Sequence, residues 1–214
     1  MFHKIICGLA ILGAIAGAPA SAATVDVIVT DSDGAPAPNA VVSLAPENAA
    51  TAVASHVPEE SIIDQRHETF LPLVVVVRKG GEVVFTNNDV TKHQVYSFSP
   101  VRRFQFEIDK GQVSKPVVFD KAGVAAIGCN IHDNMVAYVY VAEVPFAVVT
   151  DNSGHAEIRD VPEGRYFANM WHPRLPIGRK SASSALVVDG PHMKLSLSAE
   201  LTAMPAMKMH KSDY

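Results

Sequence analysis

A short segment near residue 130 combines three side chains that bind soft metal ions. It reads Cys129-Asn130-Ile131-His132-Asp133-Asn134-Met135, which places a thiol, an imidazole and a thioether at a C-x-x-H-x-x-M spacing. A second imidazole, His93, stands in an upstream loop that we expect between two strands. A thiolate and two imidazoles in a trigonal plane, with a weak thioether contact, suit both oxidation states of copper. The pattern therefore indicates a copper site for one-electron transfer.

The same residues allow other chemistry. Zinc shares the His and Cys ligands, but a methionine is a poor ligand for zinc. A redox thiol without metal is a second alternative, and a Cys/His hydrolase is a third. Cys129 and His132 on one short loop do not by themselves supply an oriented base, and no oxyanion motif accompanies them. Taken alone, Cys129 is equally typical of a buried apolar thiol.

The elements that must position these residues read as strands. After residue 23 no long segment has an apolar period of 3.6, and short valine-rich runs alternate with turns of Asp, Asn, Gly and Pro. This pattern is typical of a β-sandwich or barrel, so we expect an all-β protein. The expected strands are 25–29, 40–44, 73–77, 82–86, 94–98, 117–119, 136–141, 166–170 and 195–201.

The first 22 residues are typical of an export signal. A lysine at position 4 precedes the apolar run 5–18, and Ala20-Ser21-Ala22 offers small residues for cleavage. The apolar run is shorter than the ~20 residues that a membrane-spanning helix needs. We therefore expect a cleaved signal peptide at 1–22, a periplasmic location and no transmembrane segment in the mature chain. Cleavage would remove Cys7 and leave Cys129 as the single mature cysteine.

The composition excludes some classes of protein. The chain has 214 residues, 48% of them hydrophobic, which is typical of a globular protein. Its 18 basic and 22 acidic residues give a net charge of −4, which argues against general nucleic-acid binding. Two cysteines exclude a scaffold held together by several disulfides.

Two segments far apart in the chain resemble halves of one domain. VDVIVTDSDGAPAPNAVVSL (25–44) and TDNSGHAEIRDVPEGRY (150–166) are similar to the two halves of a carboxypeptidase-regulatory-like, prealbumin-like β-sandwich. The resemblance implies one sandwich built from 24–56 and 144–201, with a second domain inserted at 57–143. Insertion at an exposed loop is physically tolerated. Two or three small β units in sequence remain the alternative. Residues 202–214 would form a flexible tail that contains Met and His.

The candidate ligand segments resemble those of the cupredoxins, the blue (type 1) copper proteins. Asn87-Asn88-x4-His93-x-Val95 is similar to the first-ligand segment of plastocyanin, and C-x2-H-x2-M to the ligand loop of amicyanin. The run Phe119-Asp120-Lys121-Ala122-Gly123 resembles the turn that leads into the ligand strand. VYSFSP, FDKAGV and GCNIHD are also similar to exported cupredoxin-like proteins of methylamine utilisation. The resemblance implies a Greek-key β-sandwich at 57–143.

The resemblance also implies roles for individual residues. His93, Cys129 and His132 would be the equatorial ligands of one type 1 copper, and Met135 the axial ligand. Asn88 would support the site, either by a hydrogen bond near the Cys129 thiolate or by tying the ligand loops together. Cupredoxins often carry a bulky or aromatic residue before the ligand cysteine, and here Gly128 departs from that pattern.

The expected function is a periplasmic one-electron carrier, not an enzyme. Its partners would be a dehydrogenase, a cytochrome or another periplasmic redox protein, which would dock on an apolar surface near His132. A copper delivery or storage protein is one alternative, favoured by the Met-rich stretch 204–210. A metal-free binding module on a cupredoxin scaffold is another. We expect His67 at the surface or near the site, and Trp171 in a core or at a domain junction.

Overall fold

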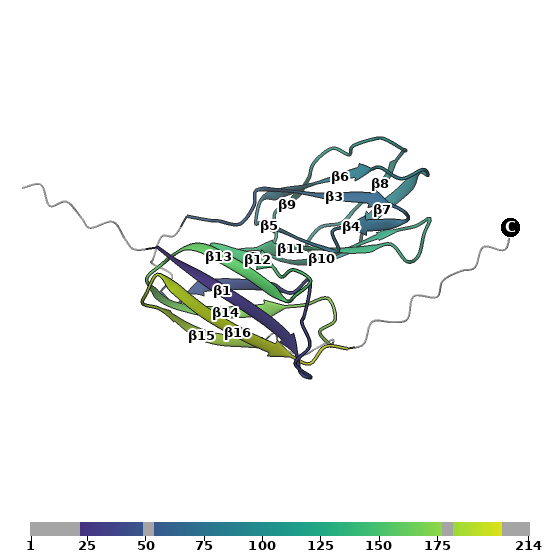
Figure 1. Cartoon of the computed structure of the whole chain (residues 1–214). Coiled ribbons are helices and arrows are strands. Elements are labelled where there is room, and N and C mark those ends of the chain that lie inside the picture. Colours follow the sequence, from purple (N-terminus) through teal and green to yellow (C-terminus); the bar gives the residue numbers. More distant parts are fainter. Residues whose placement is uncertain (1–21, 49–53, 177–181, 203–214) are drawn as a thin grey trace, which may run out of the picture.

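The computed structural model describes residues 22–48, 54–176 and 182–202. Within these ranges the chain forms sixteen strands in four sheets and no helix, which confirms the all-β class. No helix able to span a membrane is found in the described residues. The strands build two sandwiches, and the chain passes through one of them twice (Figure 1).

The first sandwich, here called the flanking sandwich, is formed by strands from both ends of the chain. Its three-stranded sheet has the order β13 (His155–Pro162), β1 (Ala22–Asp31), β16 (His192–Ala199). Its four-stranded sheet has the order β12 (Phe146–Val149), β2 (Val41–Pro46), β14 (Gly164–Trp171), β15 (Ala182–Val188). β1 is antiparallel to β13 and parallel to β16, so an early strand is paired on both edges with late strands.

The second sandwich, here called the central sandwich, contains strands β3–β11. One sheet has the order β5 (Val74–Arg78), β11 (Val136–Ala142), β10 (Gly123–Cys129), β7 (His93–Ser97), β8 (Phe104–Ile108). The other has the order β4 (Thr69–Leu71), β3 (Glu60–Arg66), β6 (Gly81–Asn87), β9 (Val117–Phe119). Alternate residues of these strands point into a shared core, as in β6, where Val83 and Phe85 are fully buried.

A four-valine run shows how the two sandwiches meet. Val74–Val77 in β5 are all buried, although a strand with one wet face would alternate. Val75 and Val77 belong to the core of the central sandwich, whereas Val74 and Val76 lie in a cluster shared with the flanking sandwich. The strand is therefore covered on both faces, which explains its continuous apolar sequence.

An aromatic group fixes the same junction. The indole of Trp171, at the end of β14, lies 5.6 Å from the ring of Tyr138 and 6.0 Å from that of Tyr140, both on β11. Aromatic pairs at these separations stabilise an interface beyond the area they bury. The expectation that Trp171 packs at a junction is confirmed.

Candidate metal centre

Two neighbouring strands bring the first imidazole and the thiol together. β7 and β10 are antiparallel, with Cys129 opposite Val95, so His93 at the start of β7 lies near Cys129 at the end of β10. Strand alternation turns both side chains inward. His93 is 0% and Cys129 3% exposed. Both groups are thus held in the core at one end of the central sandwich.

The turn after β10 adds the second imidazole. The backbone N–H of Met135 donates to the carbonyl of His132 at 3.0 Å, which closes the loop between β10 and β11. His132 Nδ1 lies 3.3 Å from His93 Nδ1, and His93 Nδ1 lies 3.8 Å from Cys129 Sγ. One ligand atom from each of these residues lies within 4.8 Å of the others. In the described ranges no other group of three His, Cys, Asp or Glu side chains meets this condition.

These distances fit a trigonal metal site. For a first-row ion with metal–nitrogen bonds of about 2.0 Å and a metal–sulfur bond of about 2.3 Å, the edges are about 3.5 Å and about 3.7 Å. The nitrogen pair is observed at 3.3 Å and the nitrogen–sulfur pair at 3.8 Å. Two imidazoles and one thiolate in a plane are the donor set that suits a one-electron copper centre.

The side chain of Met135 is compatible with two roles. Its side chain is 2% exposed and packs in the same apolar cluster as Cys129. A thioether in that place is available as a weak axial ligand. It also fills the core as any apolar side chain would, so its axial role stays a prediction.

The outer nitrogen of His93 has a buried partner. Asp89 Oδ2 lies 3.2 Å from His93 Nε2, and both side chains are nearly inaccessible to solvent. The same carboxylate accepts the backbone N–H groups of Glu68 and Val90, each at 2.7 Å. Burial by itself raises the pKa of Asp89, but these hydrogen bonds outweigh it and hold the pKa below its ordinary value. An ionised Asp89 orients the ring so that Nδ1 faces the thiol.

Asp89 was missed in the sequence, although it stands four residues before His93. Glu68 was missed as well, and it lies on the other imidazole: its Oε1 is 3.4 Å from His132 Nε2. The expected neighbour His67 is exposed, in the two-residue turn between β3 and β4 that also holds Glu68.

The structure corrects the expectation for Asn88. Its side-chain amide donates to Asp64 Oδ1 on β3 at 2.8 Å, in an exposed position. Strand alternation explains this, because β6 turns Asn87 inward and leaves residue 88 exposed. Asn87 is the buried amide, and it donates to the carbonyls of Thr91 and Ile108. The contact to the sulfur comes instead from the backbone N–H of Ile131, 3.5 Å from Cys129 Sγ.

Gly128 has a physical reason for being small. A Cβ at this position would lie 2.6 Å from the ring carbon Cζ and the hydroxyl oxygen of Tyr96, its partner on β7. Tyr96 in turn lies 4.8 Å from the exposed ring of Phe98. The aromatic group beside Cys129 therefore comes from the neighbouring strand.

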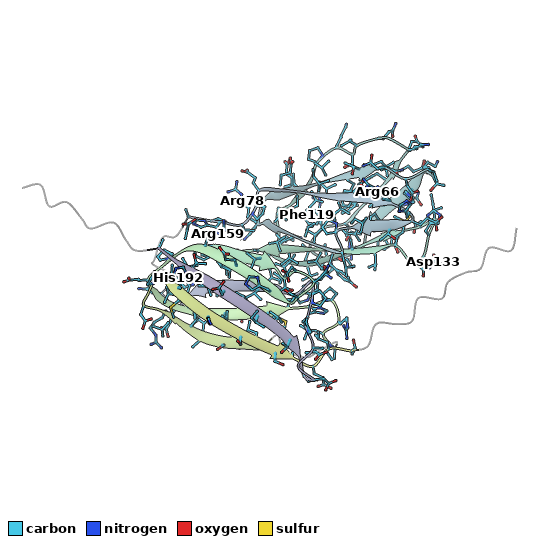
Figure 2. The ribbon with its side chains drawn as sticks, in the orientation of Figure 1. Arg66, Arg78, Phe119, Asp133, Arg159 and His192 are labelled. Carbon is cyan, nitrogen blue, oxygen red and sulfur yellow. The ribbon has the colours of Figure 1, made fainter. Side chains whose placement is uncertain are left out.

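The candidate site lies at one end of the central sandwich, where the His132 side chain is 22% exposed. Figure 2 shows Asp133 at that end, with Arg66 nearby and Arg78 toward the opposite end. Val90 and Ile131, from the two loops that hold the ligands, are exposed apolar side chains. The Met-rich stretch 204–210 and most of the expected signal peptide lie outside the described residues.

Comparison with known proteins gives likenesses in structure only. No protein-family model and no curated protein matches the chain. A purple cupredoxin from Nitrosopumilus maritimus is 22% identical over 38% of this chain and 99% of its own, with a TM-score of 0.35. Amicyanin from Paracoccus versutus is 20% identical over 46% of this chain and 97% of its own, with a TM-score of 0.35. A copper-containing nitrite reductase from Thermus scotoductus is 21% identical over 46% of this chain but 25% of its own, with a TM-score of 0.37.

Proposed function

We propose that this protein binds one copper ion at His93, Cys129 and His132 and carries single electrons between redox partners. The observation that supports this most directly is the convergence of two Nδ1 atoms and one Sγ within 4.8 Å of one another. Met135 completes the proposed set as a weak axial ligand. Bound copper would supply the change between Cu(I) and Cu(II).

The residues of the chain prepare this site before any metal arrives. β7 and β10 fix His93 and Cys129 on a rigid sheet, and Asp89 holds the His93 ring from its far side. The backbone N–H of Ile131 lies 3.5 Å from the sulfur of Cys129 and helps to fix its position. A site whose ligands are already in place changes little in geometry between two oxidation states, which favours rapid electron transfer.

The proposal includes a periplasmic location and a redox protein as partner. Export to the periplasm is favoured by the first 22 residues, and a carrier rather than an enzyme is favoured by the single site of this kind within the described residues. Val90 and Ile131 supply exposed apolar contacts beside His132, as small transient redox interfaces require. A dehydrogenase, a cytochrome or another redox protein would fit such a surface.

The visible and EPR spectra of the mature protein with one equivalent of Cu(II) test the metal site. We expect an intense thiolate-to-copper band and a narrow copper hyperfine splitting, both lost in Cys129→Ser. His155→Gln serves as a matched control, because His155 lies on the flanking sandwich. A pale spectrum that Cys129→Ser leaves unchanged would contradict the electron-transfer function and favour copper delivery or a metal-free scaffold.

A further inference from the structure

The solvent-side nitrogen of His132 faces a carboxylate. Nδ1 of this ring points to His93 Nδ1 at 3.3 Å, while Nε2 lies 3.4 Å from Oε1 of Glu68. A neutral imidazole that binds a metal through Nδ1 carries its hydrogen on Nε2 and needs an acceptor there. The Glu68 carboxylate lies within ion-pair distance of Nε2, where such an acceptor is needed.

An unusual turn brings Glu68 to this place. β3 and β4 are joined by the two residues His67 and Glu68, with Arg66 paired to Thr69. Their φ angles are 50° and 53°, as in a type I′ hairpin turn, which ordinarily takes Asn and Gly. A glutamate at positive φ is conformationally unfavourable, so contacts must hold it. The backbone N–H of Glu68 donates to Asp89 Oδ2 at 2.7 Å.

Glu68 is thereby connected to both imidazoles. Asp89 Oδ2, which accepts from the Glu68 backbone, also lies 3.2 Å from His93 Nε2. The side chain of Glu68 reaches His132 directly. The Glu68 side chain thus lies at Nε2 of His132, and the Glu68 backbone N–H supports Asp89, the carboxylate that lies at Nε2 of His93.

We propose that Glu68 is a positioning residue of the metal centre, which holds His132 with Nδ1 free to bind the metal. This inference rests on the proposed copper site. The Glu68 side chain is 60% exposed, and an ion pair with such exposure contributes little to folding stability. Its contribution therefore falls on the orientation and tautomer of the ring.

Two substitutions separate this role from a structural one. Glu68→Gln keeps an acceptor oxygen for Nε2 and removes the charge. Glu68→Gly removes the acceptor but favours the positive φ of the turn, so the hairpin should be at least as stable. Glu60→Gln is the matched control, because Glu60 is an exposed glutamate at the other end of β3.

Two measurements report the tautomer of the His132 ring and the metal affinity of the site. Nitrogen-15 NMR of the metal-free protein reports which imidazole nitrogen of His132 carries the proton. Competition with a Cu(I) chelator reports metal affinity without any assay of electron transfer. We expect Glu68→Gly to move the proton toward Nδ1 and to weaken Cu(I) binding about tenfold, the lower end of the effect of such outer partners. Glu68→Gln should stay close to the wild-type protein in both.

Equal tautomer populations and equal Cu(I) affinity in Glu68→Gly and the wild-type protein would overturn the proposal. A loss of affinity in Glu60→Gln as large as in Glu68→Gly would overturn it too, since general charge would then be the cause. If the wild-type protein gives no thiolate-to-copper band, the proposed copper function fails, and the NMR result on the metal-free chain still decides the role of Glu68.

Discussion

Asp89 and His93 form a buried pair at the base of the candidate metal centre, with Oδ2 and Nε2 3.2 Å apart and the ring's other nitrogen facing Cys129. The carboxylate accepts three hydrogen bonds in all, two of them from the backbone. An ionised acceptor with so many donors fixes the loop and the ring at once. Removing its charge therefore affects binding as well as folding.

Asp89→Asn tests this pair. An amide has one acceptor oxygen, so at least one of the three donors loses its partner and faces an NH₂ group instead. We expect metal affinity to fall between about 10- and 100-fold, as for other partners of ligating histidines. Chelator competition measures this, and the exposed Asp120→Asn is the control. Unchanged affinity in Asp89→Asn would show that the ring is held by packing alone.

Met135→Leu distinguishes an axial ligand from a core side chain. The two side chains have similar volume, so unfolding of the metal-free protein should change by less than about 1.5 kcal/mol. Loss of a thioether should nevertheless raise the reduction potential and alter the EPR parameters of the copper-loaded protein. Identical potentials and spectra would leave Met135 as a core residue only. Urea unfolding of the metal-free protein provides the stability half of the comparison.

The Tyr96 ring and Gly128 should show strong coupling in a double-mutant cycle. An added Cβ in Gly128→Ala lies 2.6 Å from the ring, so Tyr96 must move. We expect a cost of about 1 kcal/mol, at the low end for overpacking because the far end of a side chain yields. In a Tyr96→Ala background the same change should cost nothing further. A full additional cost there would mean that the strain arises from the backbone of β10.

Most of the candidate ligands could be predicted from the sequence. Cys129, His132 and Met135 come from one short segment, and the resemblance to cupredoxin ligand segments added His93, although the pairing of β7 with β10 that joins His93 to Cys129 is long-range. Glu68 could not be predicted, because its contact to His132 depends on a two-residue turn with positive φ in residues that rarely adopt it. Which of Asn87 and Asn88 points inward depends on the alternation along β6, and a one-residue error in that alternation turns the wrong side chain inward.

Some strands could be predicted from the sequence and others could not. The Val-rich run 73–77 predicted β5, whereas β15 begins with a run of exposed Ser and Ala and was missed. β8 was also missed, although its sequence FQFEI alternates apolar and polar residues. Burial on both faces of β5 could be read from its composition, but the identity of the covering surface could not.

His172 should make stability depend on pH. It is buried, Nε2 donates to the carbonyl of Pro38 at 2.9 Å, and Nδ1 accepts from the backbone N–H of Arg174 at 3.0 Å. Burial lowers the pKa of His172, the Pro38 contact opposes this and the charge of Arg174 adds to it. In the window just below the ordinary pKa of about 6.5, the unfolded chain binds the proton and the folded chain does not.

Stability is therefore fully present above that value and falls as the pH drops toward the lowered pKa of the folded state. Denaturant unfolding between pH 8 and pH 5 measures the slope. His172→Gln should flatten it, whereas the exposed His192→Gln should not. A steeper or unchanged slope in His172→Gln would assign the dependence to other groups.

Trp171 should hold the two sandwiches together. Its indole packs on Tyr138 and Tyr140 across the junction, in the cluster that also covers the outer face of β5. Trp171→Ala removes both ring contacts, and we expect a loss of about 3 kcal/mol, the low end for a large aromatic truncation because this side chain is half-buried. Calorimetry and limited proteolysis should show the two sandwiches unfolding less cooperatively.

The control lies on the same strand. Phe167 is 48% exposed and stands on the same face of β14 as Trp171, four residues earlier. Phe167→Ala should change stability by no more than about 0.5 kcal/mol, as for other surface substitutions. If Trp171→Ala were equally mild, the junction would depend on the aliphatic contacts of Val41, Val74 and Val76 rather than on the aromatic group. The opposite result is that cooperativity is lost in Trp171→Ala and kept in Phe167→Ala. That result would show that the flanking sandwich supports the sheet of β10 and β11 through the indole of Trp171.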